Sequence, residues 1–362
     1  MAGLYLHIPF CARRCSYCDF YSTTRSALRD AYADALVREA GRRKTEIREP
    51  FQTVYFGGGT PSQLTVAQLE RILNGLNRHL DLSQVTECTL EANPDDLRPE
   101  YLSALRQLGF NRLSVGVQSF NDAYLKFMNR RHTAAEAVQA IQRARGAGFS
   151  NLSVDLMYGL PKQTETDWNH TLLQAIDLRP EHLSAYHLSY EEGTVMYRYR
   201  NDAVSEETSL RLFHTLCNTL AEKGYEHYEI SNFALPRRRS LHNSHYWQGI
   251  PYLGLGAGAH SYDGKNRRCW NPDNLEGYLN GSAGREEETL SDKDHYNELV
   301  MTRLRIIEGI DTSEIPESYR DGFLRRARIW LRQSLLEERN GRVRLTKKGI
   351  FVSDSIIRDL FE

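Results

Sequence analysis

Short apolar runs alternate with longer amphipathic stretches over the first 225 residues of the chain. An apolar run of about four to eight residues indicates a buried strand, and a hydrophobic period of about 3.6 residues indicates a helix that packs on one face. The predicted strands are 4–8, 53–56, 86–91, 112–116, 151–156 and 182–188. The predicted helices are 27–44, 66–80, 99–108, 134–147, 165–176 and 206–223. Six strand–helix units in succession predict a parallel sheet with helices outside it.

This order of elements predicts an α/β fold. Six units are too few for the complete eight-unit barrel, so we expect a partial (βα)6 barrel that is open along one side. In parallel barrels the loops that follow the strands form the active face. A polar or glycine-rich motif directly after a strand therefore counts more toward function than the same motif elsewhere.

The strand–helix alternation ends near residue 225. A stretch rich in glycine and aromatic residues follows at 226–290. The last segment, 291–362, contains further helical patterns and one short strand; these are the helices 294–307, 317–336 and 348–360 and the strand 342–345. Helices followed by a short β wing are typical of a winged-helix-like module. We therefore divide the chain into a partial barrel (1–225), an extension (226–290) and a smaller C-terminal helical, winged-helix-like module (291–362).

The overall charge is nearly balanced, because 46 basic and 47 acidic residues give a formal net charge of −1. This balance excludes a surface that binds nucleic acid or anionic lipid over its whole extent. No apolar run approaches the ~18 residues of a membrane span, and the N-terminal residues lack the basic and apolar regions of a signal peptide. We therefore expect a cytoplasmic protein without a transmembrane segment.

Three of the six cysteines, Cys11, Cys15 and Cys18, lie in the loop after the first predicted strand. Such clustering in a large chain argues against a disulfide scaffold and for a metal or redox site. The spacing C-x3-C-x2-C suits an iron–sulfur cluster, because iron in such clusters prefers cysteine sulfur. A [4Fe–4S] cluster held by three cysteines has one iron open to an outside ligand. The alternative is a structural zinc site with His7 or a distant residue as fourth ligand, although zinc motifs usually contain a second ligand pair and the chain has none.

The following strand ends also carry polar or glycine-rich residues. The sequence GGGTP at 57–61 follows the second strand, Glu91 ends the third, Gln118 follows the fourth and Asp155 ends the fifth. Glycines let backbone amides approach a ligand closely, and a carboxylate that ends an apolar strand suits a ribose hydroxyl or an ammonium group better than packing. A tight turn and a helix cap are the structural alternatives for GGGTP and for EANP at 91–94. Together these elements predict one ligand-binding rim.

The cysteine motif on the first strand–helix loop of a partial barrel resembles the radical S-adenosylmethionine superfamily. This resemblance implies a [4Fe–4S] cluster on the three cysteines and S-adenosylmethionine on the open iron. Reductive cleavage of the sulfonium would then give a 5′-deoxyadenosyl radical, with the cofactors carrying the chemistry. The S-adenosylmethionine contacts implied by the resemblance are Tyr5, Tyr17, Gly58, Gly59, Thr60, Glu91, Gln118, Arg130 and Asp155. Arg131, next to Arg130, is a rival for that position.

Six segments narrow the resemblance to the oxygen-independent coproporphyrinogen dehydrogenase branch: LYLHIPFC, CDFYS, FGGGTPS, EANP, GVQSF and DLMYGLP. The branch, which is linked to porphyrin biosynthesis, contains true dehydrogenases and haem chaperones. The dehydrogenases have a further cysteine where this chain has Phe20, and a long N-terminal extension where Cys11 lies ten positions from the first residue. Both features favour a chaperone, which would lack dehydrogenase activity; cleavage of S-adenosylmethionine stays open.

The segment 241–247 contains HN-x2-YW, an element that the resemblance associates with haem. Haem needs an axial donor and apolar or aromatic walls. The implied haem residues are His242, Asn243, Tyr246 and Trp247, with His245 as a rival axial ligand. An ordinary buried histidine in an aromatic corner of the core is the structural alternative. The resemblance therefore implies a protein that binds haem and passes it to an acceptor protein; the acceptor, the electron donor and the ligating atom stay open.

Two other functions fit parts of the sequence. The first is oxidative decarboxylation of coproporphyrinogen III propionates, as in the dehydrogenases of the same branch. The second is nucleic-acid binding by the C-terminal module, which is rich in basic residues: Arg320, Arg325, Arg326, Arg328, Arg332, Arg342, Arg344, Lys347 and Lys348. Because Asp321, Glu337 and Glu338 are interleaved with them, as on a solvated helix face, we expect no nucleic-acid partner.

Overall fold

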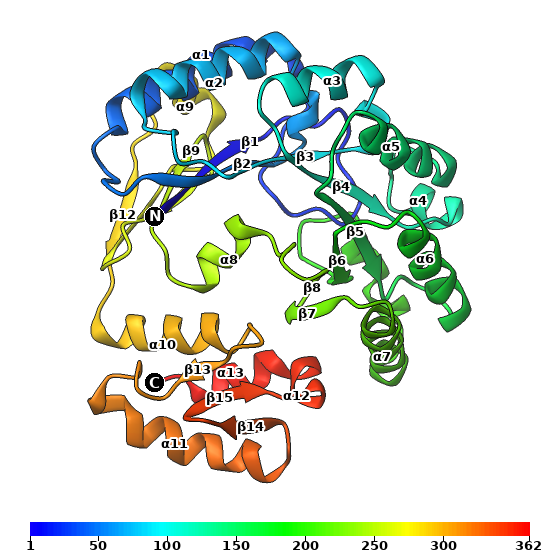
Figure 1. Cartoon of the computed structure of the whole chain (residues 1–362), viewed down its shortest axis with the longest axis vertical. Coiled ribbons are helices and arrows are strands. Elements are labelled where there is room, and N and C mark those ends of the chain that lie inside the picture. The colour runs from blue at the N-terminus through cyan, green and yellow to red at the C-terminus, as the bar shows by residue number, and fades with distance from the viewer.

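The computed structural model describes residues 1–362 and shows a curved sheet with helices on its outer side, above a smaller C-terminal module (Figure 1). Six parallel strands stand side by side in the order of the chain. They are β1 (Ala2–Ile8), β2 (Phe51–Gly58), β3 (Glu87–Ala92), β4 (Arg112–Gln118), β5 (Leu152–Tyr158) and β6 (His182–His187). The predicted partial (βα)6 barrel is confirmed.

Most of the helices that follow these strands begin at a side-chain cap, although α1 (Arg29–Arg43) and α3 (Pro99–Gln107) do not. The threonines at positions 65, 133 and 164 each form a capping box with the third residue of the helix that follows. The helices are α1 (Arg29–Arg43), α2 (Val66–His79), α3 (Pro99–Gln107), α4 (Asp122–Phe127), α5 (Ala134–Gly146), α6 (Glu165–Asp177) and α7 (Glu206–Glu222). The six-residue helix α4 was not predicted, because it is too short to show a helical period.

The segment 226–290 extends the sheet at both edges to twelve strands. Next to β6 lie β8 (Asn232–Ala234) and β7 (Glu226–Glu229), and next to β1 lie β9 (Tyr252–Leu255), β10 (His260–Tyr262), β11 (Arg267–Trp270) and β12 (Glu286–Thr289). The connection between the two edges contains α8 (Leu241–Trp247), which contacts β1 and β2, and α9 (Leu275–Asn280) follows β11. These strands of three or four residues were not predicted, because they are too short for an alternating pattern.

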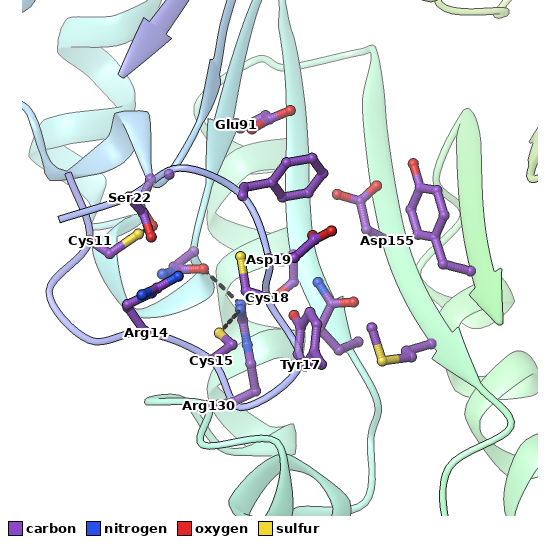
Figure 2. Close-up of a pocket in the computed structure, with 18 of the residues that line it drawn as sticks. Cys11, Arg14, Cys15, Tyr17, Cys18, Asp19, Ser22, Glu91, Arg130 and Asp155 are labelled. Atoms are coloured by element: carbon purple, nitrogen blue, oxygen red, sulfur yellow. Dashed lines mark hydrogen bonds between the residues drawn. The ribbon is translucent and has the colours of Figure 1, made fainter. Parts of the chain in front are cut away.

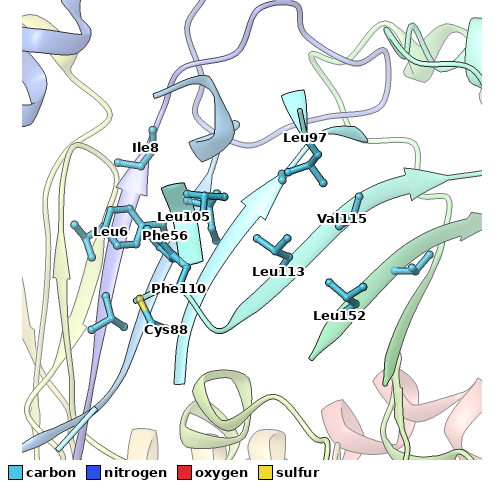
Figure 3. Close-up of a cluster of buried hydrophobic side chains, with 14 of the residues drawn as sticks. Leu6, Ile8, Phe56, Cys88, Leu97, Leu105, Phe110, Leu113, Val115 and Leu152 are labelled. Carbon is cyan, nitrogen blue, oxygen red and sulfur yellow. The ribbon is translucent and has the colours of Figure 1, made fainter. Parts of the chain in front are cut away.

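The main hydrophobic core lies between the sheet and the outer helices (Figure 3). Leu4, Leu6 and Ile8 of β1 are completely buried there, and Phe56 of β2 packs edge-on against Phe110. Successive strand residues point to opposite faces. Tyr5, His7 and Tyr55 therefore lie on the other face of the sheet, which lines the interior of the barrel.

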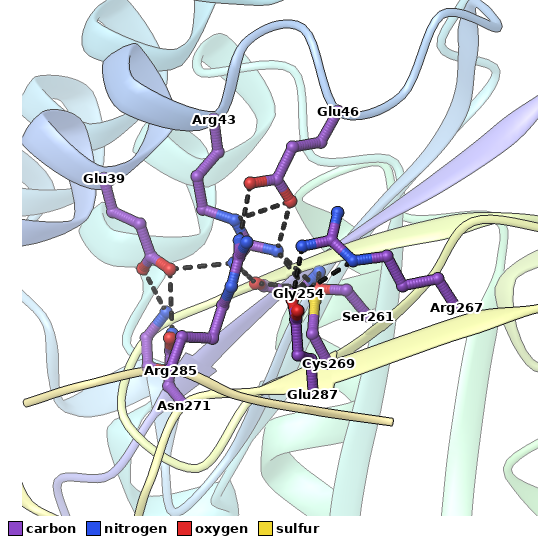
Figure 4. Close-up of polar contacts among 11 residues, drawn as sticks. Glu39, Arg43, Glu46, Gly254, Ser261, Arg267, Cys269, Asn271, Arg285 and Glu287 are labelled. Atoms are coloured by element: carbon purple, nitrogen blue, oxygen red, sulfur yellow. Dashed lines mark hydrogen bonds and ion pairs between the residues drawn. The ribbon is translucent and has the colours of Figure 1, made fainter. Parts of the chain in front are cut away.

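A buried arginine joins α1 to the sheet extension (Figure 4). The Arg43 guanidinium donates to Glu39 Oε1 at 2.9 Å and to the Gly254 carbonyl at 2.7 Å. It also donates to Ser261 Oγ at 2.8 Å and to Cys269 Sγ at 3.7 Å. This network holds β9, β10 and β11 against the barrel. Cys269 is part of this network and lies away from the loop that contains Cys11, Cys15 and Cys18.

The C-terminal module has a separate hydrophobic core and a three-stranded sheet of β13 (Ile310–Asp311), β15 (Arg342–Leu345) and β14 (Leu336–Arg339). Its helices are α10 (Asp292–Arg303), α11 (Glu317–Arg332), α12 (Lys347–Phe351) and α13 (Ser353–Leu360). Helices with a β hairpin agree with the predicted winged-helix-like module. The three-part division of the chain at 225 and 290 stays a prediction.

Three predicted boundaries in this module were wrong, the first of them the end of the helix predicted at 294–307, which stops at Arg303. The helix predicted to reach residue 336 ends at Arg332, because Ser334 adopts a left-handed backbone with φ of 58° and turns the chain into β14. The final helix, predicted as one element, is divided at Val352, whose φ of −112° is outside the helical range. No helix in the chain is both long and apolar enough to cross a membrane.

Candidate functional site

A cavity of about 430 Å³ opens at the carboxyl ends of the parallel strands (Figure 2). Its lining brings together all the residues predicted for the cluster and for S-adenosylmethionine except Tyr5: Cys11, Cys15, Tyr17, Cys18, Gly58, Gly59, Thr60, Glu91, Gln118, Arg130 and Asp155. They come from the loop after β1, from the ends of β2 to β5 and, for Arg130, from the turn between α4 and α5. The topology of the barrel thus gathers residues that are up to 144 positions apart, from Cys11 to Asp155.

The three predicted cluster ligands lie on a loop that folds back over the end of β2. The Cys11 N–H donates to the Thr23 carbonyl at 2.8 Å, and Thr60 Oγ1 donates to Cys11 Sγ at 3.4 Å. Burial raises the pKa of the Cys11 thiol, and it raises the pKa of the Cys18 thiol to about 11. No three His, Cys, Asp or Glu side chains converge as ligands of a single metal ion would.

His7, the alternative fourth ligand of a zinc site, is fully engaged elsewhere. Its Nε2–H donates to the Tyr21 carbonyl at 3.1 Å, and Nδ1 accepts from the Tyr5 hydroxyl at 3.1 Å. Both ring nitrogens are therefore used in hydrogen bonds. The same contact explains why Tyr5 does not line the cavity: its hydroxyl is bonded to His7, and its ring stacks against Tyr55 and His242.

The glycines after β2 are required by close packing. A Cβ on Gly59 would lie 2.8 Å from the backbone carbonyl carbon of Pro9. Gly58 has a φ of +109°, and a Cβ there would lie 2.6 Å from the His7 ring. The turn therefore lets the cysteine loop lie directly on the strand end. The glycines are required for this tight turn, whether or not they also bind a ligand. The Gly58 N–H donates to Glu91 Oε2 at 3.1 Å.

Two carboxylates face the cavity without a cationic partner. Burial raises the pKa of Glu91 to about 7, although the Tyr55 hydroxyl donates to its Oε1 at 2.7 Å. Burial also raises the pKa of Asp155, which accepts from Ser114 Oγ at 3.1 and 3.2 Å. A bound ammonium group or ribose hydroxyls would satisfy these oxygens, because buried carboxylates need hydrogen-bond donors or opposite charge.

Arg130, and not its neighbour Arg131, reaches the cavity. Arg130 Nη1 donates to Cys15 Sγ at 3.1 Å, and Nη2 donates to Asn93 Oδ1 at 2.7 Å. Arg131 instead forms ion pairs of 2.9 Å with Asp95 and Asp96. Arg130 is therefore the residue that links the cysteine loop to the end of β3.

Gln118 and Tyr17 also line the cavity. Gln118 is in a left-handed conformation with φ of 69°, at a bulge in the pairing of β4 with β5. Such strain in a non-glycine residue often marks a binding site. Tyr17 lies between Cys15 and Cys18, and burial raises the pKa of its phenol.

Sequence reasoning missed several residues that line the same cavity, notably Asn93, Ser114 and Tyr186. Ser114 lies two residues before Gly116 on β4, and Tyr186 lies on β6 with 44% of its surface exposed. Strand alternation could have found Ser114, because it shares the inner face with Gly116. Nothing in the sequence marked Tyr186 as a cavity residue, because an aromatic residue in a strand is usually assigned to the core.

The predicted haem residues are divided between the barrel interior and a second cavity. His242 is 1% exposed; its Nδ1 is hydrogen-bonded to Thr53 Oγ1 at 2.8 Å, and its Nε2 to the Tyr246 hydroxyl at 2.9 Å. Burial lowers the pKa of His242 to about 3, so the ring is neutral. His245 is also buried and its Nε2–H donates to Gln52 Oε1 at 3.1 Å.

The other motif residues lie nearer the surface. Asn243 is half-buried on α8, and its N–H donates to the Ser240 hydroxyl. Tyr246 and Trp247 line a cavity of about 310 Å³ beside α10. Trp247 Nε1 is buried without a hydrogen-bond partner. The structure therefore joins His242 to Tyr246 by a hydrogen bond, but it does not place all four predicted haem residues in the lining of one cavity.

Several basic residues of the C-terminal module are engaged within it. Arg326 pairs with Glu362, Arg342 with Asp311 and Arg344 with Glu337. Arg320 donates to the carbonyls of Thr312 and Ile315. These four arginines are therefore bound within the module, and the expectation that it has no nucleic-acid partner stays a prediction.

The comparisons with known proteins define the class first. Residues 5–175 match the Radical SAM superfamily, and residues 290–352 match the HemN C-terminal domain. The solved structure described as "Coproporphyrinogen III oxidase (HemN) from Escherichia coli is a Radical SAM enzyme" aligns with a TM-score of 0.86 and 25% identity, over 99% of this chain and 90% of that one. This protein is therefore a radical S-adenosylmethionine protein of HemN-like architecture.

Curated relatives narrow the class to one family. "Heme chaperone HemW" of Lactococcus lactis is 35% identical over 97% of this chain and 95% of its own length. "Heme chaperone HemW" of Escherichia coli K12 is 33% identical over 84% of this chain and 83% of its own length. The chain belongs to the HemW family, and the predicted resemblance is confirmed.

Proposed function

We propose that this protein is a haem chaperone that holds a [4Fe–4S] cluster and S-adenosylmethionine in the cavity at the strand ends and passes haem to an acceptor protein. One observation carries the proposal: the identity to relatives named haem chaperones extends over 97% of the chain, and so includes the cysteine loop, α8 and the C-terminal module.

The donor set of the strand-end cavity supports the two cofactors. Cys11, Cys15 and Cys18 supply three thiol ligands, which suits a cluster with one open iron. Glu91 and Asp155 supply two carboxylates that lack a cation, which suits a ligand with an ammonium group and ribose hydroxyls. When bound, these groups supply one-electron reductive cleavage of a sulfonium.

The chain's own residues hold and orient the ligands. Arg130 holds the cysteine loop through Cys15, and Gly58 and Gly59 let that loop approach the strand end. The Tyr55 hydroxyl and the Gly58 N–H orient the Glu91 carboxylate toward the cavity. Cluster assembly must remove the protons of buried thiols, so metal binding releases protons.

Titration of the anaerobically reconstituted protein with ferric haem tests the chaperone function. We expect saturable binding of one haem per chain, measured by the growth of a Soret band. Binding that does not saturate, or that is matched by an unrelated protein of equal size, contradicts the proposal.

A second candidate is the decarboxylation of coproporphyrinogen III, which the TM-score of 0.86 to the oxidase favours. Against it, Phe20 stands at the cavity with 65% of its surface exposed, at the position where the dehydrogenase pattern has a cysteine. Anaerobic incubation with reductant, S-adenosylmethionine and coproporphyrinogen III separates the two functions. We expect no protoporphyrinogen; its formation in repeated turnovers would replace the chaperone proposal.

A further inference from the structure

A chain of buried hydrogen bonds crosses the inside of the barrel and ends at the strand-end cavity. The Tyr228 hydroxyl lies 2.8 Å from His182 Nε2, and His182 Nδ1 lies 2.7 Å from Ser153 Oγ. Ser153 Oγ in turn donates to Asp155 Oδ1 at 3.4 Å. Of these four residues, only Asp155 lines the cavity (Figure 2). The other three form a layer behind it.

The pairing of the strands places these side chains in a row. Ser153 and Asp155 lie two positions apart on β5 and therefore share its inner face. His182 lies opposite Ser153 in the parallel pairing of β5 with β6. Tyr228 lies on β7, at the edge of the sheet, with the Arg239 guanidinium over its ring at 5.2 Å. The chain of hydrogen bonds thus runs from the sheet edge to the cavity.

Burial fixes the direction of the first hydrogen bond. Tyr228 is 1% exposed, and its hydroxyl has no hydrogen-bond partner other than His182 Nε2. A buried hydroxyl proton needs an acceptor, so the phenol donates to Nε2. His182 is completely buried, and burial together with the nearby Arg112 guanidinium holds the pKa of its ring well below the usual value. The ring is therefore neutral and carries its single proton on Nδ1.

The remaining two hydrogen bonds follow from this tautomer. The His182 Nδ1–H donates to Ser153 Oγ, so the Ser153 proton must point to another acceptor. Its choices are Asp155 Oδ1 at 3.4 Å and Ser184 Oγ at 3.5 Å. A carboxylate is a stronger acceptor than a hydroxyl. All three protons of the chain therefore point toward Asp155.

We propose that His182 is a positioning residue for S-adenosylmethionine binding, because its Nδ1–H tautomer, fixed by Tyr228, directs the Ser153 hydroxyl to Asp155. This proposal rests on the proposed function, in which Asp155 binds the ligand. A hydroxyl donor favours the ionised form of a buried carboxylate, and that form accepts the ribose hydroxyls. If the Tyr228 hydroxyl is removed, the ring proton can move to Nε2. Nδ1 then accepts the Ser153 proton and withdraws it from Asp155.

The test compares two tyrosines at the same sheet edge. Tyr228→Phe removes the first donor of the chain. Tyr225→Phe is the matched control, because the Tyr225 hydroxyl is also buried but donates to the Pro180 carbonyl and has no link to Asp155. Ser153→Ala removes the last donor. Circular dichroism reports whether each full-length variant is folded.

Two measurements separate positioning from a general loss of stability. Equilibrium dialysis of the anaerobically reconstituted protein against S-adenosylmethionine at pH 8, where Glu91 is mostly ionised, gives the dissociation constant. Long-range ¹H–¹⁵N spectra of histidine-labelled protein give the tautomer of His182. Its signals are identified by their loss in His182→Gln.

We expect the wild type to show the Nδ1–H tautomer of His182. Ser153→Ala should weaken S-adenosylmethionine binding by about tenfold, as for one hydrogen bond to a charged group. Tyr228→Phe should weaken binding by about threefold to tenfold and show the Nε2–H tautomer, whereas Tyr225→Phe keeps the wild-type affinity and tautomer.

Three results overturn the positioning role alone: an Nε2–H tautomer in the wild type, wild-type affinity in Ser153→Ala or Tyr228→Phe, or an equal loss of affinity in the two tyrosine variants. The first two of these need only the wild type and Ser153→Ala, so they decide the matter even where Tyr228→Phe does not fold. Failure of the reconstituted wild type to bind S-adenosylmethionine overturns the proposed function, and the positioning role with it.

Discussion

The two cavities at opposite ends of the parallel strands are built in different ways. The cavity at the carboxyl ends collects residues from consecutive strand ends, so the topology of the barrel alone brings them together. The cavity at the amino ends is formed by α8, the short strands of the extension and α10, which are distant in sequence and follow no repeating unit. A site of the first kind can be predicted from strand positions, whereas a site of the second kind needs the packed structure.

The largest expected effect is loss of the cluster from the first cavity. Cys15→Ser removes the thiol that accepts a hydrogen bond from Arg130 and one of three ligands, so we expect no [4Fe–4S] spectrum after anaerobic reconstitution. Cys217→Ser, at a half-buried cysteine on α7, is the matched control and keeps the spectrum. Equal iron content and EPR signals in the two variants would show that the loop does not hold the cluster.

The second effect comes from Glu91, whose pKa rises from 4.5 to about 7, mainly because it is buried. The folded protein therefore binds this proton more tightly than the unfolded chain. The contribution of Glu91 to the free energy of unfolding is fully present below about pH 4.5. It is lost as the pH rises through about 7, and the total loss is up to about 3 kcal/mol. Ionisation above pH 7 also favours a cationic ligand, so S-adenosylmethionine affinity should rise over the same range.

Glu91→Gln removes this titration. Urea unfolding of the cofactor-free protein at pH 5 and pH 8 should show a smaller loss of stability for the variant than for the wild type. A loss of equal size in both proteins would mean that Glu91 is not the group responsible.

The third effect tests the close packing of the cysteine loop. Gly59→Ala places a Cβ 2.8 Å from the Pro9 backbone, and we expect it to lower the free energy of unfolding by about 1–3 kcal/mol. Gly146→Ala, at the end of α5 with no atom within 4 Å of the new methyl group, should have little effect or stabilise the protein. Thermal unfolding of both variants separates local crowding from a general sensitivity to substitution.

The smallest effect belongs to the other end of the barrel. His242→Phe keeps a ring against Tyr55 but removes the hydrogen bonds to Thr53 and Tyr246, so we expect a loss of about 1–2 kcal/mol in stability. The EPR signal of the cluster should be unchanged, because the ring lies outside the strand-end cavity. A changed cluster signal would show that the two ends of the barrel are coupled.

The same contrast explains which parts of the molecule the sequence could predict. The six strands, their helices and the strand-end residues follow from periodicity, caps and the rule that loops after strands meet on one face. The short strands β7 to β12 and the break at Val352 do not, because three or four residues carry no period. Arg130 could not be separated from Arg131 by position, since only the ion pairs of Arg131 with Asp95 and Asp96 decide between them.

The HN-x2-YW segment shows most clearly where prediction from the sequence fails. Four nearby positions predict one site, but α8 directs His242 into the barrel and leaves Tyr246 and Trp247 at a different cavity. His242 and Tyr246 are four residues apart on one face of α8 and are hydrogen-bonded at 2.9 Å, whereas Trp247 follows on the next position and faces the cavity beside α10.

EPR of the reconstituted, reduced protein with and without S-adenosylmethionine tests the central claim most directly. If three cysteines hold the cluster and leave one iron open in the strand-end cavity, addition of S-adenosylmethionine changes the g values of the reduced [4Fe–4S] signal. An identical signal with and without S-adenosylmethionine, in a protein that contains the full cluster, would contradict the account.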